Sequence, residues 1–121
     1  MMQYEVRARS TETFGRVLVS SRNHHIVVDG PAASGCPGEA LTPPELFLAG
    51  IAACGVELVQ VIARDRQAPL EAVGATVSGR IDRSQPVRPD LTLFNAIRLE
   101  FLLKGVTPEQ GGELVAAFKR R

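Results

Sequence analysis

The segment that most restricts the fold of this chain is an uncharged run of eleven residues, 46–56. It follows Thr42-Pro43-Pro44-Glu45, which is typical of a helix start, because the threonine and glutamate side chains can each accept a backbone amide and proline is favoured in the first turn. No proline interrupts residues 46–63, so we predict one long helix. A helix that is apolar all round is either a core helix or a membrane span. The uncharged run is too short to cross a bilayer, so the pattern predicts a buried central helix.

Small residues cluster in the middle of this predicted helix, between Ala49 and Gly55. Each glycine inside a helix costs about 1 kcal/mol relative to alanine, and this cost is usually offset where another backbone packs closely. A chain of 121 residues has little with which to surround a helix on every side. We therefore expect a subunit interface along this helix.

The first third of the chain reads as extended. Residues 2–10, 16–20 and 25–28 have the alternation or the apolar run of short strands, and Asp29-Gly30-Pro31 is a strong turn signal. Residues 30–42 contain three glycines and two prolines, which predicts an irregular loop before the long helix.

The last third predicts two strands and a second helix. Residues 73–81 and 91–103 read as a long antiparallel pair joined by a polar, proline-containing loop. Thr107-Pro108 repeats the cap-then-proline pattern of the first helix, and residues 113–119 read as helical.

The element order is thus β-β-β-α-β-β-α. Strands grouped in this way favour the α+β class with an antiparallel sheet rather than a parallel α/β sheet. The length predicts a single domain, residues 1–121.

Composition excludes several classes of function. Hydrophobic residues make up 45% and charged residues 22%, and the net charge of +1 provides no field that would attract nucleic acid or an anionic membrane. The N-terminus lacks the pattern of a secretory signal, so we expect a cytoplasmic protein with neither nucleic acid nor membrane as a partner. Adjacent His24 and His25 would point to opposite faces of a strand, so we expect no metal site and no cofactor.

Cys54, in the middle of the predicted helix, is the main candidate for chemistry. A buried free cysteine is often only a small hydrophobe, and burial away from a helix N-terminus disfavours the thiolate. A reactive Cys54 therefore needs a cation from another segment. Glu57 shares its helix face and could relay a proton or simply meet solvent. Glu45 lies half a turn away and about 13 Å along the axis, so capping is its expected role.

Residues 42–54 resemble the Pro-x-Glu-Leu and Ala-Ala-Cys signature of the OsmC/Ohr family, and residues 24–30 are similar to the His and Asp segment of its OsmC-like branch. The order of elements is similar too. The resemblance implies an antiparallel sheet wrapped around a long central helix in an intertwined homodimer. It also implies thiol-dependent reduction of organic hydroperoxides, with Cys54 as the peroxidatic thiol, a second cysteine as resolving thiol and an external dithiol as reductant.

This chain departs from the family pattern in three ways. The family's second cysteine usually follows the last helix, about where this sequence stops, which leaves Cys36 as the candidate resolving thiol and leaves open a missing C-terminal segment. The Ohr-type arginine aligns with Thr13, so Arg16 and Arg22 are the candidate substitutes. The Ohr glutamate falls one position before Glu45.

Two readings follow. The first is an OsmC-like peroxidase that protects against organic hydroperoxides through Cys54, with His24 as a further candidate cation or proton relay. The second is a non-enzymatic OsmC-like dimer that binds a small apolar or electrophilic ligand at its interface.

Overall fold

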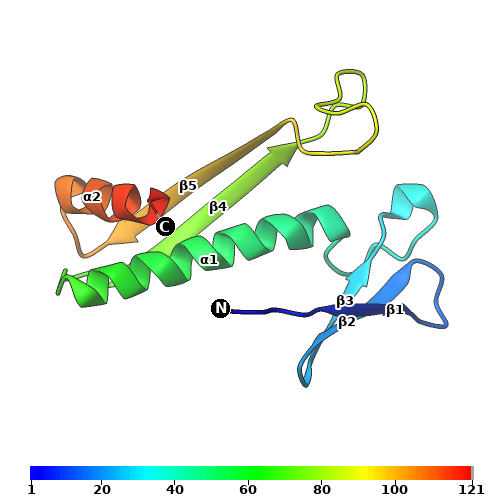
Figure 1. Ribbon diagram of the computed structural model, residues 1–121, viewed down its shortest axis with the longest axis horizontal. Helices are drawn as coiled ribbons and strands as arrows, with labels where there is room; N and C mark the ends of the chain where they lie inside the picture. The colour runs from blue at the N-terminus through cyan, green and yellow to red at the C-terminus, as the bar shows by residue number, and fades with distance from the viewer. Residues whose placement is uncertain (121) are drawn as a thin grey trace. The chain divides into compact units, whose positions relative to one another are not determined.

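The computed structural model describes residues 1–120 and contains two helices and two antiparallel sheets (Figure 1). The predicted α+β class and the predicted element order are both confirmed. The chain forms two compact units, Met1–Phe47 (unit 1) and Leu48–Arg121 (unit 2). The prediction of a single domain stays a prediction. The elements are β1 (Arg7–Ser10), β2 (Arg16–Ser21), β3 (His24–Asp29), η1 (Ala32–Ser34), α1 (Pro43–Asp65), β4 (Ala72–Arg80), β5 (Ala96–Lys104) and α2 (Pro108–Lys119).

Unit 1 contains a three-stranded sheet in the order β1-β2-β3. The turn from β2 to β3 places Arg22 at a φ of 54°, in the left-handed region that tight turns use. The first strand begins at Arg7, later than the predicted residue 2, because Arg7 pairs with Ser20 near the end of β2 and earlier residues have no partner. The Ser21 hydroxyl donates to the Glu5 carbonyl at 2.9 Å, and Arg7 Nη1 lies 3.4 Å from Glu5 Oε1.

The loop before α1 is irregular as predicted, apart from the short 3-10 turn η1. The predicted capping box at the start of α1 is confirmed. The Glu45 amide donates to Thr42 Oγ1 at 3.4 Å, and the Thr42 amide donates to Glu45 Oε1 at 3.0 Å. The helix ends where Gln67 takes a φ of 55° and the Ala68 amide donates to the Ala63 carbonyl.

Unit 2 contains β4 and β5, paired antiparallel from Ala72 with Lys104 to Arg80 with Ala96. The second strand begins at Ala96 and not at the predicted residue 91. The ladder ends next to Asn95, whose backbone amide still donates to the Arg80 carbonyl while its side-chain oxygen accepts from the Asp82 amide at 2.7 Å and its side-chain Nδ2 donates to the Gln85 carbonyl. These bonds tie the connecting loop together and withdraw the preceding residues from pairing.

The second helix begins at Pro108, five residues before its predicted start. Thr107 forms a capping box with Gln110, in which each side chain accepts a backbone amide from the other residue. Two glycines, Gly111 and Gly112, weakened the helical pattern, but the cap and the packing of the helix override their low propensity.

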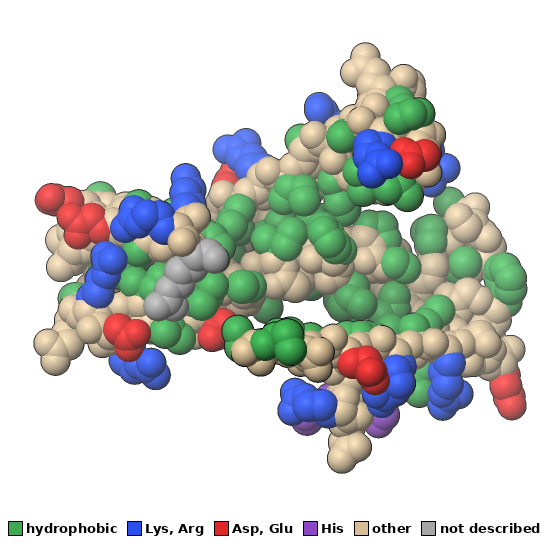
Figure 2. Space-filling view, viewed as in Figure 1, with side chains coloured by type: hydrophobic (Ala, Val, Ile, Leu, Met, Phe, Trp, Pro, Cys, Tyr) green, Lys and Arg blue, Asp and Glu red, His purple; other side chains and the backbone are tan. Residues whose placement is uncertain are grey.

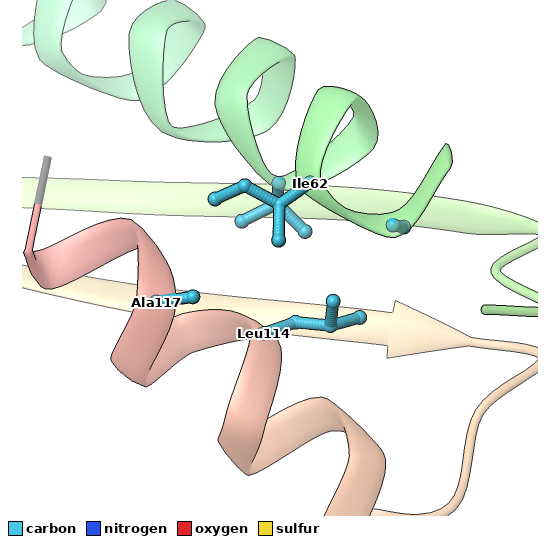
Figure 3. Close-up of a cluster of buried hydrophobic side chains, with 5 residues drawn as sticks. Ile62, Leu114 and Ala117 are labelled. Atoms are coloured by element: carbon cyan, nitrogen blue, oxygen red, sulfur yellow. The ribbon is translucent and has the colours of Figure 1, made fainter. Parts of the chain in front are cut away.

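The core of unit 2 lies where α1 and α2 meet. Ile62 of α1 and Leu114 and Ala117 of α2 point toward one another in Figure 3, and all are at least nine-tenths buried. Partly buried side chains of β5 and α2, Phe101 and Phe118 among them, pack around this cluster. Hydrophobic side chains are nevertheless visible at the surface over α1 and the β4–β5 pair (Figure 2). The core of one chain is therefore small.

By length and composition alone α1 could also cross a membrane, and 22% of its most apolar stretch is buried. The core helix of a water-soluble protein satisfies the same criterion.

Candidate functional site

Cys54 is exposed on α1, so one chain does not bury the predicted central helix on all sides, and its burial by a second copy stays a prediction. The buried residues of α1 are Gly55, Val59, Ile62 and Ala63, which recur at the spacing of a single helix face. One sheet of two strands and one short helix can cover only that face. Cys54 precedes Gly55 by one residue, about 100° around the helix, and so falls outside the covered face.

The exposed face around Cys54 is formed by small residues together with one carboxylate and one amide side chain. Gly50, Ala53, Cys54, Glu57 and Gln60 are all exposed and follow one another at helical spacing. A side chain at Gly50 would meet nothing within 4 Å in this chain. This face therefore leaves the thiol open to another molecule. Glu57 is the carboxylate that shares this face with Cys54, as its spacing predicts.

Glu45 has the capping role that its position predicts. The hydrogen bonds from the amide and the hydroxyl of Thr42, at 3.0 and 2.8 Å, hold the pKa of Glu45 below its usual range. Its carboxylate is thus ionised and occupied at the first turn of α1.

Arg16 lies in a cluster with two carboxylates in unit 1. Its Nε donates to Asp29 Oδ1 at 2.8 Å, and its Nη2 donates to Asp29 Oδ2 at 2.9 Å and to Glu39 Oε1 at 3.0 Å. The paired carboxylates raise the pKa of Arg16, and the Arg16 hydrogen bonds hold the pKa of Asp29 below its usual range. The cluster of one cation and two anions carries a net negative charge.

The sequence patterns predict for Asp29 only a place in a turn and in the segment 24–30 that is similar to the OsmC-like branch. Its side chain is fully buried, and it also accepts the Glu39 amide at 2.9 Å, while its own amide donates to the Leu41 carbonyl. A lone aspartate ending an apolar strand, with an arginine opposite it in register, is the signal that could have revealed it. Asp29 therefore fastens both ends of the loop that leads to α1.

Arg22 and His24 occupy the turn between β2 and β3 and its edge. The Arg22 carbonyl accepts from Arg7 Nη2 at 3.3 Å. Arg22 itself is exposed. His24 pairs with Ser21 in the β2–β3 register and is also exposed, while its neighbour His25 lies 2.7 Å from Ser20 Oγ through Nδ1. Both Arg22 and His24 are therefore accessible cations or proton carriers, in contrast to Arg16.

Cys36 is packed against two glycines of unit 1. A Cβ atom at Gly15 or at Gly30 would lie 2.5 Å from Cys36 Sγ, closer than such atoms approach in real structures. The amide of Gly30 also donates to the Gly15 carbonyl at 2.8 Å, so the sulfur sits over a hydrogen-bonded backbone contact. The half-buried thiol of Cys36, the candidate resolving thiol, is therefore held in place by these contacts.

Two groupings of candidate residues thus emerge. Unit 1 joins Arg16 to Asp29 and Glu39, and unit 2 places Cys54 and Glu57 on one exposed helix face. Among residues 1–120, no three His, Cys, Asp or Glu side chains lie together as metal ligands would. Fold and site define a small α+β protein with a solvent-accessible thiol on its longest helix.

The particular family follows from comparison. A family model described as OsmC-like protein matches residues 36–121, and the chain belongs to this family. No curated protein matches the chain.

Solved structures share the fold. An OsmC-like protein from Mycoplasma pneumoniae is 17% identical with a TM-score of 0.84, over 99% of this chain and 82% of that one. An organic hydroperoxide resistance protein from Elizabethkingia anophelis, with thiocyanate bound, is 18% identical with a TM-score of 0.77, over 99% and 83% of the two chains. A putative organic hydroperoxide resistance protein from Vibrio cholerae is 21% identical with a TM-score of 0.64, over 99% and 81%. That protein holds captopril in one of its active sites.

Proposed function

We propose that this protein is a thiol-dependent peroxidase that reduces organic hydroperoxides through Cys54. The observation that carries the proposal is the exposed position of Cys54 on α1, within a chain of the OsmC-like family. Peroxide reduction requires a thiol that solvent and substrate can reach. The names of the Elizabethkingia and Vibrio proteins, which describe organic hydroperoxide resistance, support the same substrate class.

The first chemical step is a displacement at oxygen. The Cys54 thiolate attacks one peroxide oxygen, so that an S–O bond forms while the O–O bond breaks. The departing alkoxide takes up a proton and leaves as an alcohol. Sulfur is oxidised to a sulfenic acid and the hydroperoxide is reduced. Glu57, which shares the exposed face with Cys54, is the candidate to carry a proton here.

The second step restores the thiol. A second thiolate attacks the sulfenic sulfur, forms a disulfide and releases hydroxide, which leaves as water after taking up a proton. A dithiol reductant then exchanges with this disulfide and becomes oxidised itself. Cys36 is the candidate second thiol, although its contacts with Gly15 and Gly30 would have to open first. The thiol of an external reductant is the alternative.

A nearby cation would favour the Cys54 thiolate. Among the three candidates, Arg16 is the weakest on physical grounds, because Asp29 and Glu39 already outnumber its charge. Arg22 and His24 are exposed, and no carboxylate among residues 1–120 forms an ion pair with either. They are therefore the stronger candidates.

We also propose that the protein acts as a cytoplasmic homodimer. The uncovered face of α1 supports this, since small residues such as Gly50 and Ala53 lie there exposed in the single chain. Gly50 supports it too, because its missing side chain serves no contact within one chain. A second copy that packs near Gly50 would cover this surface, and the proposed activity requires that it leave Cys54 open to substrate.

The competing function is binding without catalysis. A dimer of this kind could hold a small apolar or electrophilic ligand at its interface, and the captopril in the Vibrio protein shows that a relative accepts an organic molecule in its active site. The pKa of the thiol separates the two: a peroxidase needs a thiolate at neutral pH, whereas a binding protein does not.

The test is to treat the purified protein with tert-butyl hydroperoxide and dimedone, which traps sulfenic acid, and to locate the adduct by mass spectrometry. We expect an adduct at Cys54, and none in Cys54→Ser. Cys36→Ser is the matched control and should retain the Cys54 adduct. Failure of hydroperoxide to modify Cys54 in the wild-type protein would sink the proposal.

A further inference from the structure

A phenylalanine of β5 lies directly against the backbone of α1 at the residue after Cys54. A Cβ atom added to Gly55 would lie 2.9 Å from Phe101 Cζ and 3.1 Å from Phe101 Cε1. Real Cβ atoms essentially never approach another atom more closely than 3.0 Å. Glycine is thus the only residue type at position 55 that leaves room for the Phe101 ring where it now lies.

The ring of Phe101 is itself held by a second aromatic side chain. Phe101 and Phe118 form an edge-to-face pair with centroids 5.4 Å apart and an interplanar angle of 76°. Phe118 comes from α2 and lies 3.7 Å from the same position at Gly55. Both rings pack on one side against the buried cluster of unit 2, and on the other they line an open pocket of about 670 Å³.

This contact fixes α1 at its first buried residue. The other buried positions, Val59, Ile62 and Ala63, lie further toward the C-terminus of the helix. Because successive residues differ by about 100° around a helix, the seating of Gly55 on Phe101 sets the direction in which Cys54 points. A displacement of about 1 Å at a reacting atom is enough to reduce a rate strongly.

We propose that Phe101 is a positioning residue for Cys54, acting through its contact with Gly55 and braced by Phe118. The inference rests on the proposed function only for its hydroperoxide readout. Phe101 does not touch the reacting atoms; it determines how the helix presents the thiol. The small residue after Cys54 and the aromatic residue on β5 form one functional pair.

The decisive variants are Gly55→Ala, Phe101→Leu and their double mutant. In Gly55→Ala the new methyl group and the ring must move apart, which on our proposal displaces α1, and we expect the second-order rate of Cys54 with tert-butyl hydroperoxide to fall by roughly tenfold or more. In the double mutant the smaller leucine makes room, and we expect most of that rate to return. Gly112→Ala, a glycine of α2 with nothing within 4 Å, is the matched control and should react like the wild type.

A purely structural role would change thermal stability without changing the chemistry of the folded protein. Each variant is therefore checked by circular dichroism, and the rate of Cys54 alkylation by iodoacetamide is measured against pH in a Cys36→Ser background. We expect Gly55→Ala to alter this profile and the double mutant to restore it. The alkylation profile decides the inference even if the wild-type protein does not react with hydroperoxide. Unchanged Cys54 chemistry in a folded Gly55→Ala protein, or a loss that Phe101→Leu fails to rescue, overturns it.

Discussion

Arg16 and Asp29 face each other across the β2–β3 pair, with Arg16 Nε 2.8 Å from Asp29 Oδ1 and Nη2 2.9 Å from Oδ2. Such a two-point contact gives direction as well as attraction. Asp29 is fully buried and also accepts the Glu39 amide, so one carboxylate joins the sheet of unit 1 to the loop before α1.

Replacement of Asp29 by alanine should destabilise unit 1, because Arg16 and the Glu39 amide would lose their acceptor. We expect the melting temperature to fall by roughly 5 °C or more. Glu39→Ala is the matched control: its side chain is 74% exposed, and the melting temperature should change little. Thermal melts followed by circular dichroism provide the comparison, and equal effects of the two variants would contradict the assignment.

The same contact predicts a sensitivity to acid. Since the hydrogen bonds from Arg16 hold the pKa of Asp29 below its ordinary value, folding favours the ionised carboxylate. This stabilisation is present above the unfolded pKa, about 4, and is lost as the pH falls through the lower folded pKa. The lowered pKa values of Glu45 and Asp82 act in the same direction. Urea unfolding at pH 7, 4 and 3 should show a progressive decrease in the free energy of unfolding, with a weaker decrease in Asp29→Asn.

The cap of α2 should be measurable by itself. Thr107→Ala removes the acceptor of the Gln110 amide, and we expect a loss of about 1 kcal/mol in the free energy of unfolding. Thr107→Ser keeps the acceptor and should cost less. Urea denaturation of the three proteins tests this, and an equal loss in both variants would show that the methyl group, not the cap, matters.

The buried cluster of unit 2 should be far more sensitive than its surface. Leu114 is 2% exposed, so Leu114→Ala should cost about 2–5 kcal/mol of the free energy of unfolding. Leu102 of β5 is 69% exposed, and the same substitution there should cost less than about 0.5 kcal/mol in the separated chain. If the protein is a dimer that covers Leu102, the second value will instead depend on protein concentration.

The proposed homodimer predicts that a charge on the exposed face of α1 disrupts assembly. Ala53 precedes Cys54 on this face, and Ala53→Arg would place a long charged side chain at the proposed contact between the two copies. We expect multi-angle light scattering to give the dimer mass for the wild type and the monomer mass for this variant. Glu113→Arg, on an exposed position of α2, changes the charge elsewhere and should leave the mass unaltered.

Much of the fold could be predicted from the sequence, because the signals are local. Thr42 and Glu45, or Thr107 and Gln110, lie three residues apart, so their capping follows from spacing alone. The element order and the identification of Cys54 likewise came from short patterns. Strand ends were less accurate. The start of β5 depends on Asn95 and Asp82, which are thirteen positions apart in the chain and meet only when the loop closes.

The sequence by itself therefore determined the elements, their order and the helix that carries the thiol. Tertiary structure alone decided which face of that helix is covered, which carboxylates hold Arg16, and that Phe101 rests on Gly55. The physical reason is the range of the interactions. Backbone hydrogen bonds and caps act between near neighbours, whereas burial and ion pairing depend on residues that only the folded chain brings together.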